Sequence, residues 1–394
     1  MEFTSNPPVR SHSACVRVKN TVDSMIHRHG RVPIYEVFHS WQKLINILFV
    51  FRYRNLETNR RVCVCKGLGD GVYGRPNHPH PRCNHIVSFP FMSKGHTIPL
   101  LYLARLLLYR RLTAAVTVIT TPANRPLIMR SLSGSPASVV TVPFPAHEAT
   151  PEIPPSTEST DQLPSMSLFP AFATATALMQ PRFEAELERL LPVSLLVSDG
   201  FLWWMLESAN KFGIPRMVFY GMSNYAVGVS PALLKMGPPD ETAADDDTFW
   251  VTAFPWIKAT KHLFEFPDPR SSDAVNFEFL MNTCSSTANS YGLVVNSFEE
   301  LEPIFLDYWN RENKPRAWCI GPLCLVDQPE PLADHEETTW IRWLDQKLEG
   351  VSVLYVAFGS QAEISAQQLE EIGMGLEKSE THFLWVVKKK ENQG

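Results

Sequence analysis

The stretch HIVSFPFMSKGHTIPLLYLARLLL, residues 85–108, reads as a buried strand, a short glycine-containing loop and a helix. Residues 85–91 are apolar, β-branched or aromatic at most positions, as expected of a central strand covered on both faces. The helix is predicted to begin near Thr97, because Pro99 suits a first helical turn. Its leucines form a broad apolar stripe, which predicts that the helix packs on a sheet.

His96 lies in the predicted loop, beside Gly95. In open α/β folds, the loop at the carboxyl end of such a strand faces the ligand crevice. A histidine with an ordinary pKa of about 6.5 can accept a proton there at neutral pH. The alternative is that His96 only caps the helix or forms a local hydrogen bond, and for a histidine considered alone that alternative is favoured.

Strand-like and helical patterns alternate after this stretch. The strand-like runs are residues 115–120, 138–142, 194–198, 216–220, 292–296 and 317–320, and the main helical patterns are residues 171–190, 202–212 and 299–309. Such alternation predicts a parallel sheet with helices on both faces. Residues 143–164 are rich in proline and serine, which predicts a long surface loop of the kind that frames binding sites.

The sequence predicts four regions. Residues 1–84 are expected to be a disordered N-terminal extension, residues 85–322 a first α/β domain, residues 323–338 a linker, and residues 339–394 the start of a second domain. The last region alternates helix, strand, helix and strand, and Ser365 and Gln368 are spaced as a capping box. It is too short for an independent core, so we expect the second domain to be incomplete.

Composition narrows the classes of function. The net charge of −5 gives no reason to expect a nucleic acid as partner, although basic residues outnumber acidic ones in residues 1–84. Seven scattered cysteines favour a reducing, cytoplasmic compartment, and we expect no membrane span. The group Cys63, Cys65, His78, His80 and Cys83 matches no common zinc spacing, so no metal is expected.

Six segments together resemble the plant UDP-dependent glycosyltransferases that modify small molecules. They are residues 85–107, 194–226 (SLLVSDGFLWWMLESANKFGIPRMVFYGMSNYA), 292–302 (GLVVNSFEELE), 318–323 (WCIGPL), 340–365 (WIRWLDQKLEGVSVLYVAFGSQAEIS) and 382–387 (HFLWVV). The resemblance implies a GT-B fold, in which two Rossmann-like domains face each other across a cleft. The first domain would bind a small-molecule acceptor and the second a UDP-sugar, which is a co-substrate and not a cofactor.

The resemblance also implies roles for individual residues. His96 matches the general base that deprotonates an acceptor hydroxyl, and Asp199 matches the carboxylate that orients it. Asp199 could also cap the turn ahead of Phe201. The implied donor contacts are Gly359 and Ser360. The implied acceptor contacts are Gly95, Phe201, Trp203, Trp204, Met222 and Asn224.

The wall of the acceptor pocket is expected to consist of Phe201, Leu202, Trp203 and Trp204, with Met222, Ser223 and Asn224 from the next strand end, and to suit a flat phenolic or terpenoid acceptor such as a flavonoid. One of the two tryptophans is expected to be a core residue, because neighbours on a helix point about 100° apart. The family's donor signature, with a stacking tryptophan and a phosphate-binding histidine, is not found after the final strand. We therefore expect a truncated, monomeric member of the family that does not transfer sugar by itself. The alternative is a non-catalytic acceptor-binding remnant or a gene-model fragment, with residues 1–84 as a mispredicted leader.

Overall fold

The computed structural model describes residues 83–145, 147–237, 247–260, 274–325, 339–347, 352–359 and 364–387. Almost all of the predicted N-terminal extension lies outside these ranges, as do most of the predicted linker and Ser360. The last two residues of the predicted N-terminal extension, Cys83 and Asn84, belong to the first described strand.

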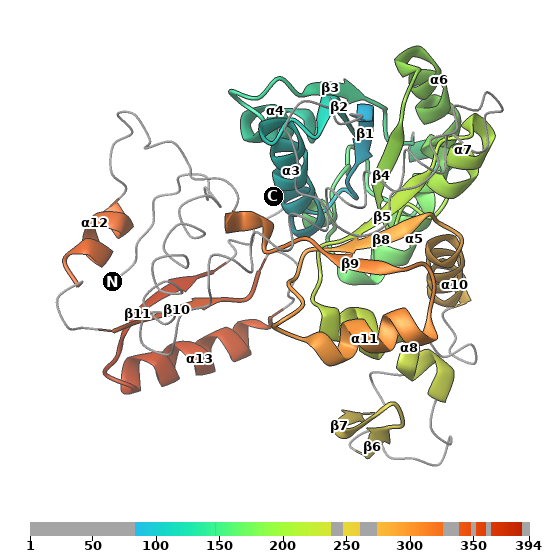
Figure 1. The fold of residues 1–394 in the computed structure, drawn as a ribbon. Coiled ribbons are helices and arrows are strands. Elements are labelled where there is room, and N and C mark those ends of the chain that lie inside the picture. Colours follow the sequence, from blue (N-terminus) through green and yellow to red (C-terminus); the bar gives the residue numbers. More distant parts are fainter. Residues whose placement is uncertain are drawn as a thin grey trace, which may run out of the picture.

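Seven parallel strands form one sheet in the order β3-β2-β1-β4-β5-β8-β9 (Figure 1). They are β1 (Cys83–Phe89), β2 (Thr113–Thr120), β3 (Ser138–Thr141), β4 (Leu195–Asp199), β5 (Arg216–Tyr220), β8 (Gly292–Val295) and β9 (Ala317–Cys319). From β1 the chain builds outward to β3, returns to the other side of β1 as β4, and builds outward again to β9. This is a doubly wound sheet, and the strand order reverses between β1 and β4.

Helices cover both faces of this sheet, as the alternating pattern predicts (Figure 1). One face packs against α3 (Lys94–Tyr109) and α4 (Arg125–Ser131). The other face packs against α5 (Phe169–Ala175), α6 (Gln180–Leu190), α7 (Met205–Phe212), α8 (Asn224–Met236), α10 (Ala274–Ala288) and α11 (Pro303–Glu312). Successive strand residues enter opposite cores, as Ile86 and Val87 do, because strand side chains alternate between the two faces.

The first helix starts earlier than predicted. The Ser93 carbonyl accepts the N–H groups of His96 at 3.0 Å and Thr97 at 2.8 Å, so α3 begins at Lys94. His96 is therefore a residue of the first helical turn and not a loop residue. Pro99 lies inside the helix. Because Pro99 has no N–H, it cannot donate the helical hydrogen bond that the carbonyl of Gly95, four residues earlier, would otherwise accept.

The predicted helix over residues 171–190 is interrupted. The short helix η4 (Thr176–Met179) separates α5 from α6, whose first turn contains Pro181. The hairpin of β6 (Thr248–Val251) and β7 (Phe254–Thr260) was not predicted, and neither were α8 and α10. Glycine and an internal proline in α8, and serine, threonine and asparagine in α10, weaken the helical pattern.

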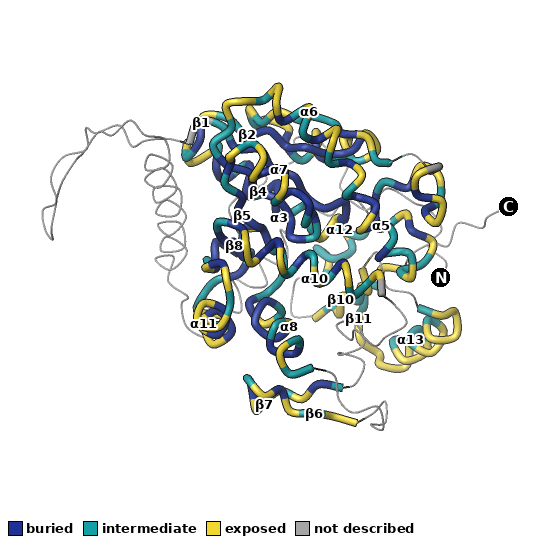
Figure 2. Tube along the Cα trace, turned by 90° about the vertical axis from the view of Figure 1, so that its right-hand side faces the viewer, coloured by how far each residue is buried: buried dark blue, intermediate teal, exposed yellow. Residues whose placement is uncertain are grey.

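A second, two-stranded sheet consists of β10 (Val353–Ala357) and β11 (His382–Val386), which pair in parallel (Figure 1). The helices of this region are α12 (Thr339–Asp345) and α13 (Ala366–Lys378). The predicted capping box is confirmed, since Ser365 and Gln368 exchange hydrogen bonds at the start of α13. Figure 2 shows this region largely exposed, while the central strands of the seven-stranded sheet, such as β4, β5 and β8, are buried.

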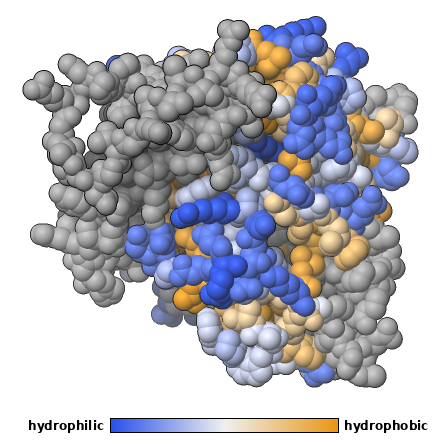
Figure 3. Space-filling view, turned by 45° about the vertical axis from the view of Figure 1, so that its right-hand side comes forward, coloured by the Kyte–Doolittle hydropathy of each residue, from blue (hydrophilic) through white to orange (hydrophobic). Residues whose placement is uncertain are grey.

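The surface carries apolar side chains in small patches between hydrophilic ones on the face drawn in Figure 3. Such scattered exposure is usual for folded proteins. Within the described ranges, no helix is both long and apolar enough to cross a bilayer.

Candidate functional site

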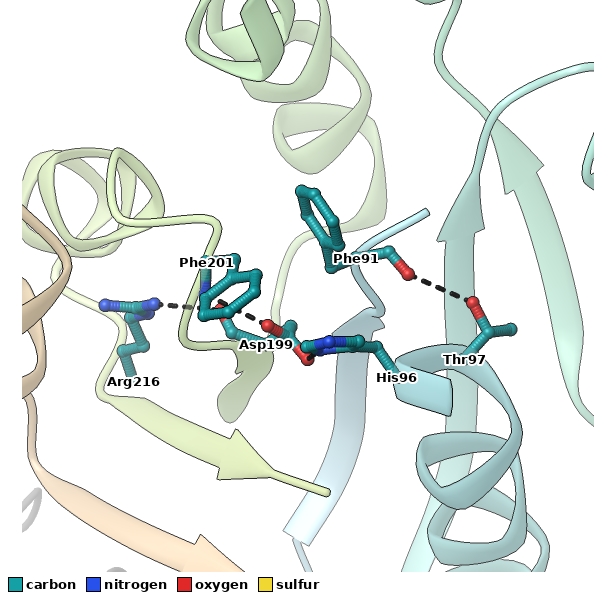
Figure 4. A network of polar contacts seen from close by, with 6 residues as sticks. All are labelled: Phe91, His96, Thr97, Asp199, Phe201 and Arg216. Carbon is teal, nitrogen blue, oxygen red and sulfur yellow. Dashed lines mark hydrogen bonds and ion pairs between the residues drawn. The ribbon is translucent and has the colours of Figure 1, made fainter. Parts of the chain in front are cut away.

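His96 and Asp199 meet where the strand order reverses. His96 follows β1, Asp199 is the last residue of β4, and the two strands pair directly. The His96 Nδ1 atom lies 2.8 Å from Asp199 Oδ2 (Figure 4). The predicted contact between these residues is therefore present, at the place where open α/β sheets bind their ligands.

The Asp199 carboxylate is held on both of its oxygens. Its side chain is 1% exposed, and Oδ1 accepts the backbone N–H of Phe201 at 2.9 Å while Oδ2 faces His96. The two functions considered for Asp199, partner of a histidine and cap of the following turn, thus coexist. A carboxylate fixed in this way holds the imidazole ring in one orientation.

The pKa of His96 is raised above its ordinary value. Burial of the ring lowers this pKa, but the negative charge of Asp199 and the hydrogen bond to it together outweigh the effect of burial. Because Nδ1 faces a carboxylate, the neutral ring carries its proton on Nδ1. Nε2 then presents a lone pair that can accept a proton from a bound hydroxyl.

Aromatic rings surround the imidazole. The ring of Phe201 lies 4.9 Å from that of His96, and the ring of Phe91 lies 5.5 Å away (Figure 4). Phe169 and Phe279 each contact Phe201, at 5.8 and 5.3 Å between ring centroids. The His96 imidazole is thus set in apolar, aromatic surroundings.

Of these rings, sequence reasoning identified only Phe201 as a site residue. Phe91 is the last residue of the predicted first strand and directly precedes the predicted loop with His96, so its short distance from His96 in the sequence could have indicated this contact. Phe279 lies on α10, which was not predicted, and Phe169 begins α5 after the proline-rich loop. Only the fold brings these two rings to Phe201.

Two of the predicted acceptor contacts are wrong. Trp204 is fully buried, its Nε1 donates to Thr176 Oγ1 at 3.1 Å, and its ring packs edge-on against Phe89 and Phe183. Asn224 is also fully buried, and its Nδ2 lies 3.2 Å from Cys319 Sγ. Both side chains are used within the core, so neither can contact a ligand in this structure.

The other predicted acceptor contacts have at least partly accessible positions. Trp203 is half-buried against the core that contains Phe201, which agrees with the expectation that only one tryptophan of the pair is internal. Met222 is half-buried, beside the core formed by β5 and β8. Gly95 is exposed in the first turn of α3, and a side-chain carbon added there would meet no atom within 4 Å.

The proline-rich loop is tied to the segment that precedes His96. Lys94 Nζ lies 2.5 Å from Asp161 Oδ2, and the N–H of Thr160 donates to the Met92 carbonyl at 3.0 Å. The hydrogen bond to Lys94, together with one from Ser159, holds the pKa of Asp161 below its ordinary value against the effect of burial, which raises it. The loop over residues 143–164 thus lies beside the site, as predicted from its composition.

The predicted donor contacts are only partly described. Gly359 follows β10, is exposed, and has a φ of +82°, a backbone conformation that favours glycine. Ser360 lies outside the described residues. Among the residues that the structure describes, no group of three or more histidine, cysteine, aspartate or glutamate side chains could hold a metal ion.

Sequence comparison finds many related proteins, although no protein-family profile matches. UDP-glycosyltransferase 90A2 of Arabidopsis thaliana is 46% identical over 313 residues, which cover 77% of this chain and 67% of that protein. UDP-glycosyltransferase 90A1 of the same plant is 50% identical over 316 residues, 78% of this chain and 65% of that protein. The chain thus spans about two thirds of the length of these relatives.

Structure comparison gives the same class. The crystal structure of UGT73P12 of Glycyrrhiza uralensis, complexed with glycyrrhetinic acid 3-O-monoglucuronide, matches with a TM-score of 0.64 at 28% identity, covering 78% of this chain and 63% of that one. UGT89C1 of Arabidopsis thaliana, complexed with UDP, matches with a TM-score of 0.59 at 26% identity, covering 79% and 67%. The fold is therefore of the α/β, GT-B type, as predicted. The chain belongs to the plant UDP-glycosyltransferase family.

Proposed function

We propose that this protein takes part in the transfer of a sugar from a UDP-sugar to a hydroxyl group of a small plant metabolite, with inversion at the anomeric carbon. The observation that carries the proposal is the 2.8 Å contact between His96 Nδ1 and Asp199 Oδ2 at the point where the strand order reverses. Family membership supplies the reaction class, and the contact supplies the base that the reaction needs.

In this mechanism the acceptor hydroxyl lies against Nε2 of His96. A hydroxyl is a poor nucleophile until a base removes its proton, and the neutral imidazole removes it as the oxygen attacks the anomeric carbon in line. Asp199 stabilises the imidazolium that forms, without itself becoming protonated. UDP leaves from the opposite face of the anomeric carbon, so the configuration inverts.

The rings of Phe91 and Phe201 suit a planar phenolic acceptor, because aromatic pairs favour edge-on and offset contacts. Two relatives support this substrate class by their names: an anthocyanin 3'-O-β-glucosyltransferase of Gentiana triflora and a scopoletin glucosyltransferase of Nicotiana tabacum. The same names support glucose as the sugar. Trp203 and Met222 are the remaining side chains that we assign to the acceptor.

We assign residues 83–322, which begin with the whole of β1 rather than at the predicted residue 85, to the acceptor-binding domain, and residues 339–394 to the UDP-sugar-binding domain. Gly359 and Ser360 are the donor contacts that we assign within the second. Holding the acceptor and the UDP-sugar in line can lower the reaction barrier by about 7–11 kcal/mol. A hydrogen bond to a charged group, such as one from Ser360 to a phosphate, contributes only about 1.5–3 kcal/mol. We therefore expect no measurable transfer by the 394-residue chain alone.

A chimera tests the proposal. Residues 1–325 of this chain would be joined to the UDP-sugar-binding half of the 90A1 relative and assayed with UDP-glucose and a panel of phenolic acceptors. We expect transfer, and the His96→Gln substitution should reduce its rate about 10²–10⁴-fold. The matched control is Thr176→Val, which removes a buried hydrogen bond to Trp204 away from the base.

Two results would oppose the proposal. Unchanged turnover in the His96→Gln chimera would show that another group acts as the base. A chimera that binds phenolic acceptors but transfers no sugar to them would favour the alternative, a non-catalytic acceptor-binding protein.

A further inference from the structure

Arg216, the first residue of β5, is a buried cation outside the predicted site. Arg216 is 1% exposed, and burial lowers the pKa of its guanidinium to about 10, so this group remains protonated at neutral pH. Burying a charge is costly unless each of its polar groups finds a partner. The contacts of this guanidinium therefore indicate what the charge is used for.

The five N–H groups of Arg216 have five oxygen partners. Nε donates to Ser198 Oγ at 2.7 Å, Nη1 to Ser286 Oγ at 2.7 Å and Ser290 Oγ at 3.2 Å, and Nη2 to the backbone carbonyls of Asp199 and Leu202, both at 3.2 Å. The planar guanidinium offers five donors in a fixed geometry, which lysine cannot match. All of its partners are hydroxyl or carbonyl oxygens.

The two carbonyls bound by Nη2 delimit the turn that carries the carboxylate. The Asp199 carbonyl also accepts the Leu202 N–H at 3.2 Å, and the Leu202 carbonyl accepts the Met205 N–H at 3.1 Å at the start of α7. Arg216 thus binds both ends of the turn whose first side chain contacts His96. Figure 4 shows Arg216 beside the Asp199 end of this turn. The three serine hydroxyls hold the guanidinium in place. Ser198 belongs to β4, Ser286 to α10, and Ser290 to the turn that follows α10.

We propose that Arg216 is a positioning residue for the His96–Asp199 pair: it fixes the turn over residues 199–202 so that the Asp199 carboxylate stays aimed at His96 Nδ1. It does not touch the acceptor, and its effect on the reaction passes through Asp199. The inference rests on the proposed function, because it treats His96 as the base.

Two titratable groups near the turn, Tyr220 and Cys284, remain neutral around pH 7. Tyr220 packs against Gly200, donates to or accepts from Thr287 Oγ1 at 3.1 Å, and has its pKa raised by burial. Burial also raises the pKa of Cys284 on α10. Among the groups near the turn, Asp199 is the one whose charge acts on the His96 ring and raises its pKa.

The test measures the pKa of His96 directly, by NMR titration of the full chain with labelled histidine and no substrate. The chain has 12 histidines, and the His96 resonance is identified by its absence in a His96→Gln variant. Arg216→Lys keeps the positive charge and removes the fork of donors. We expect the His96 pKa to fall toward its ordinary value of about 6.5, because the contact with Asp199 loosens.

A second variant and a control complete the design. The double substitution Ser286→Ala and Ser290→Ala removes both hydrogen-bond partners of Arg216 Nη1. It should also lower the His96 pKa, but by less than Arg216→Lys does. Thr176→Val should lower the melting temperature and leave the His96 pKa unchanged, since it removes a buried hydrogen bond elsewhere.

An unchanged His96 pKa in folded Arg216→Lys protein would overturn the inference and make Arg216 a purely structural residue. If that variant does not fold, the double serine variant decides by the same criterion. Since no sugar transfer is measured, failure of this inference is distinguishable from failure of the proposed function.

Discussion

Strands β4 and β10, with the sequences LLVSD and VLYVA, are both mainly apolar but have very different surroundings. Every residue of β4 is buried, whereas Leu354 and Tyr355 in β10 are 46% and 55% exposed. Strand β4 lies in the middle of seven strands with helices on both faces, and β10 pairs with β11 beside α13, a helix without a buried residue. The comparison shows that apolar, β-branched sequence determines the strand, while neighbouring strands and helices determine its burial.

The largest expected contrast between the two regions is in stability. Trp204→Ala, in the core of the seven-stranded sheet, should lower the free energy of unfolding by about 3–5 kcal/mol, because it leaves a large cavity. Tyr355→Ala in β10 should change it by less than about 0.5 kcal/mol, since that side chain is mostly exposed. Urea denaturation followed by circular dichroism measures both, and equal effects would contradict the contrast.

A glycine substitution in the seven-stranded sheet should cost less stability than Trp204→Ala. A side-chain carbon on Gly200 would lie 2.1 Å from Tyr220 Cε1, so Gly200→Ala must displace that ring and should cost about 1–3 kcal/mol of stability. Gly95→Ala is the matched control, because an added carbon there meets no atom within 4 Å. Thermal unfolding should separate the two variants clearly, and a destabilised Gly95→Ala protein would show that the first turn of α3 is more crowded than described.

Gly359→Ala tests the smaller sheet in the same way. No atom lies within 4 Å of an added side-chain carbon, so the cost comes from the positive φ of +82° alone. We expect about 1–2 kcal/mol of local destabilisation. Hydrogen exchange of the β10 amides measures it, with the β4 amides as internal reference. Faster exchange in β4 as well would mean that the two sheets unfold together.

The smallest expected effect is the pH dependence of stability that His96 contributes. Its pKa is higher in the folded than in the unfolded protein, so its contribution is complete below about pH 6.5 and is lost as the pH rises through the folded value. His85 acts in the opposite direction, because burial lowers its pKa in the folded state. The difference between the wild-type protein and His96→Gln isolates the first effect, and this difference should shrink between pH 6 and pH 8. A difference that stays constant would mean that the pKa of His96 is not raised.

Sequence alone predicted the central strands and the pairing of His96 with Asp199. The strands were predicted from their apolar, β-branched runs. The pairing was implied by the resemblance to the family, and it agrees with the rule that the carboxyl ends of neighbouring parallel strands share one edge. The sequence could not decide which of Trp203 and Trp204 is internal, because it predicts a helix over residues 202–212, whereas α7 begins at Met205 and both tryptophans lie in the turn before it. Arg216 gave no signal either, since a charged residue at the start of an apolar run is usually exposed, and the serines that satisfy it are distant in the sequence.

The order of the strands also has a consequence for how the protein folds. His96 and Asp199 are 103 positions apart in the chain, and their contact requires β1 to pair with β4, although β2 and β3 lie between these two strands in the sequence. Contacts of such long sequence separation form slowly, because the entropy of closing a long loop is lost before the contact compensates for it. Helices such as α3 can form locally much sooner. The titration of His96 is therefore a late reporter of folding, which distinguishes the native protein from a compact intermediate that already has its helices.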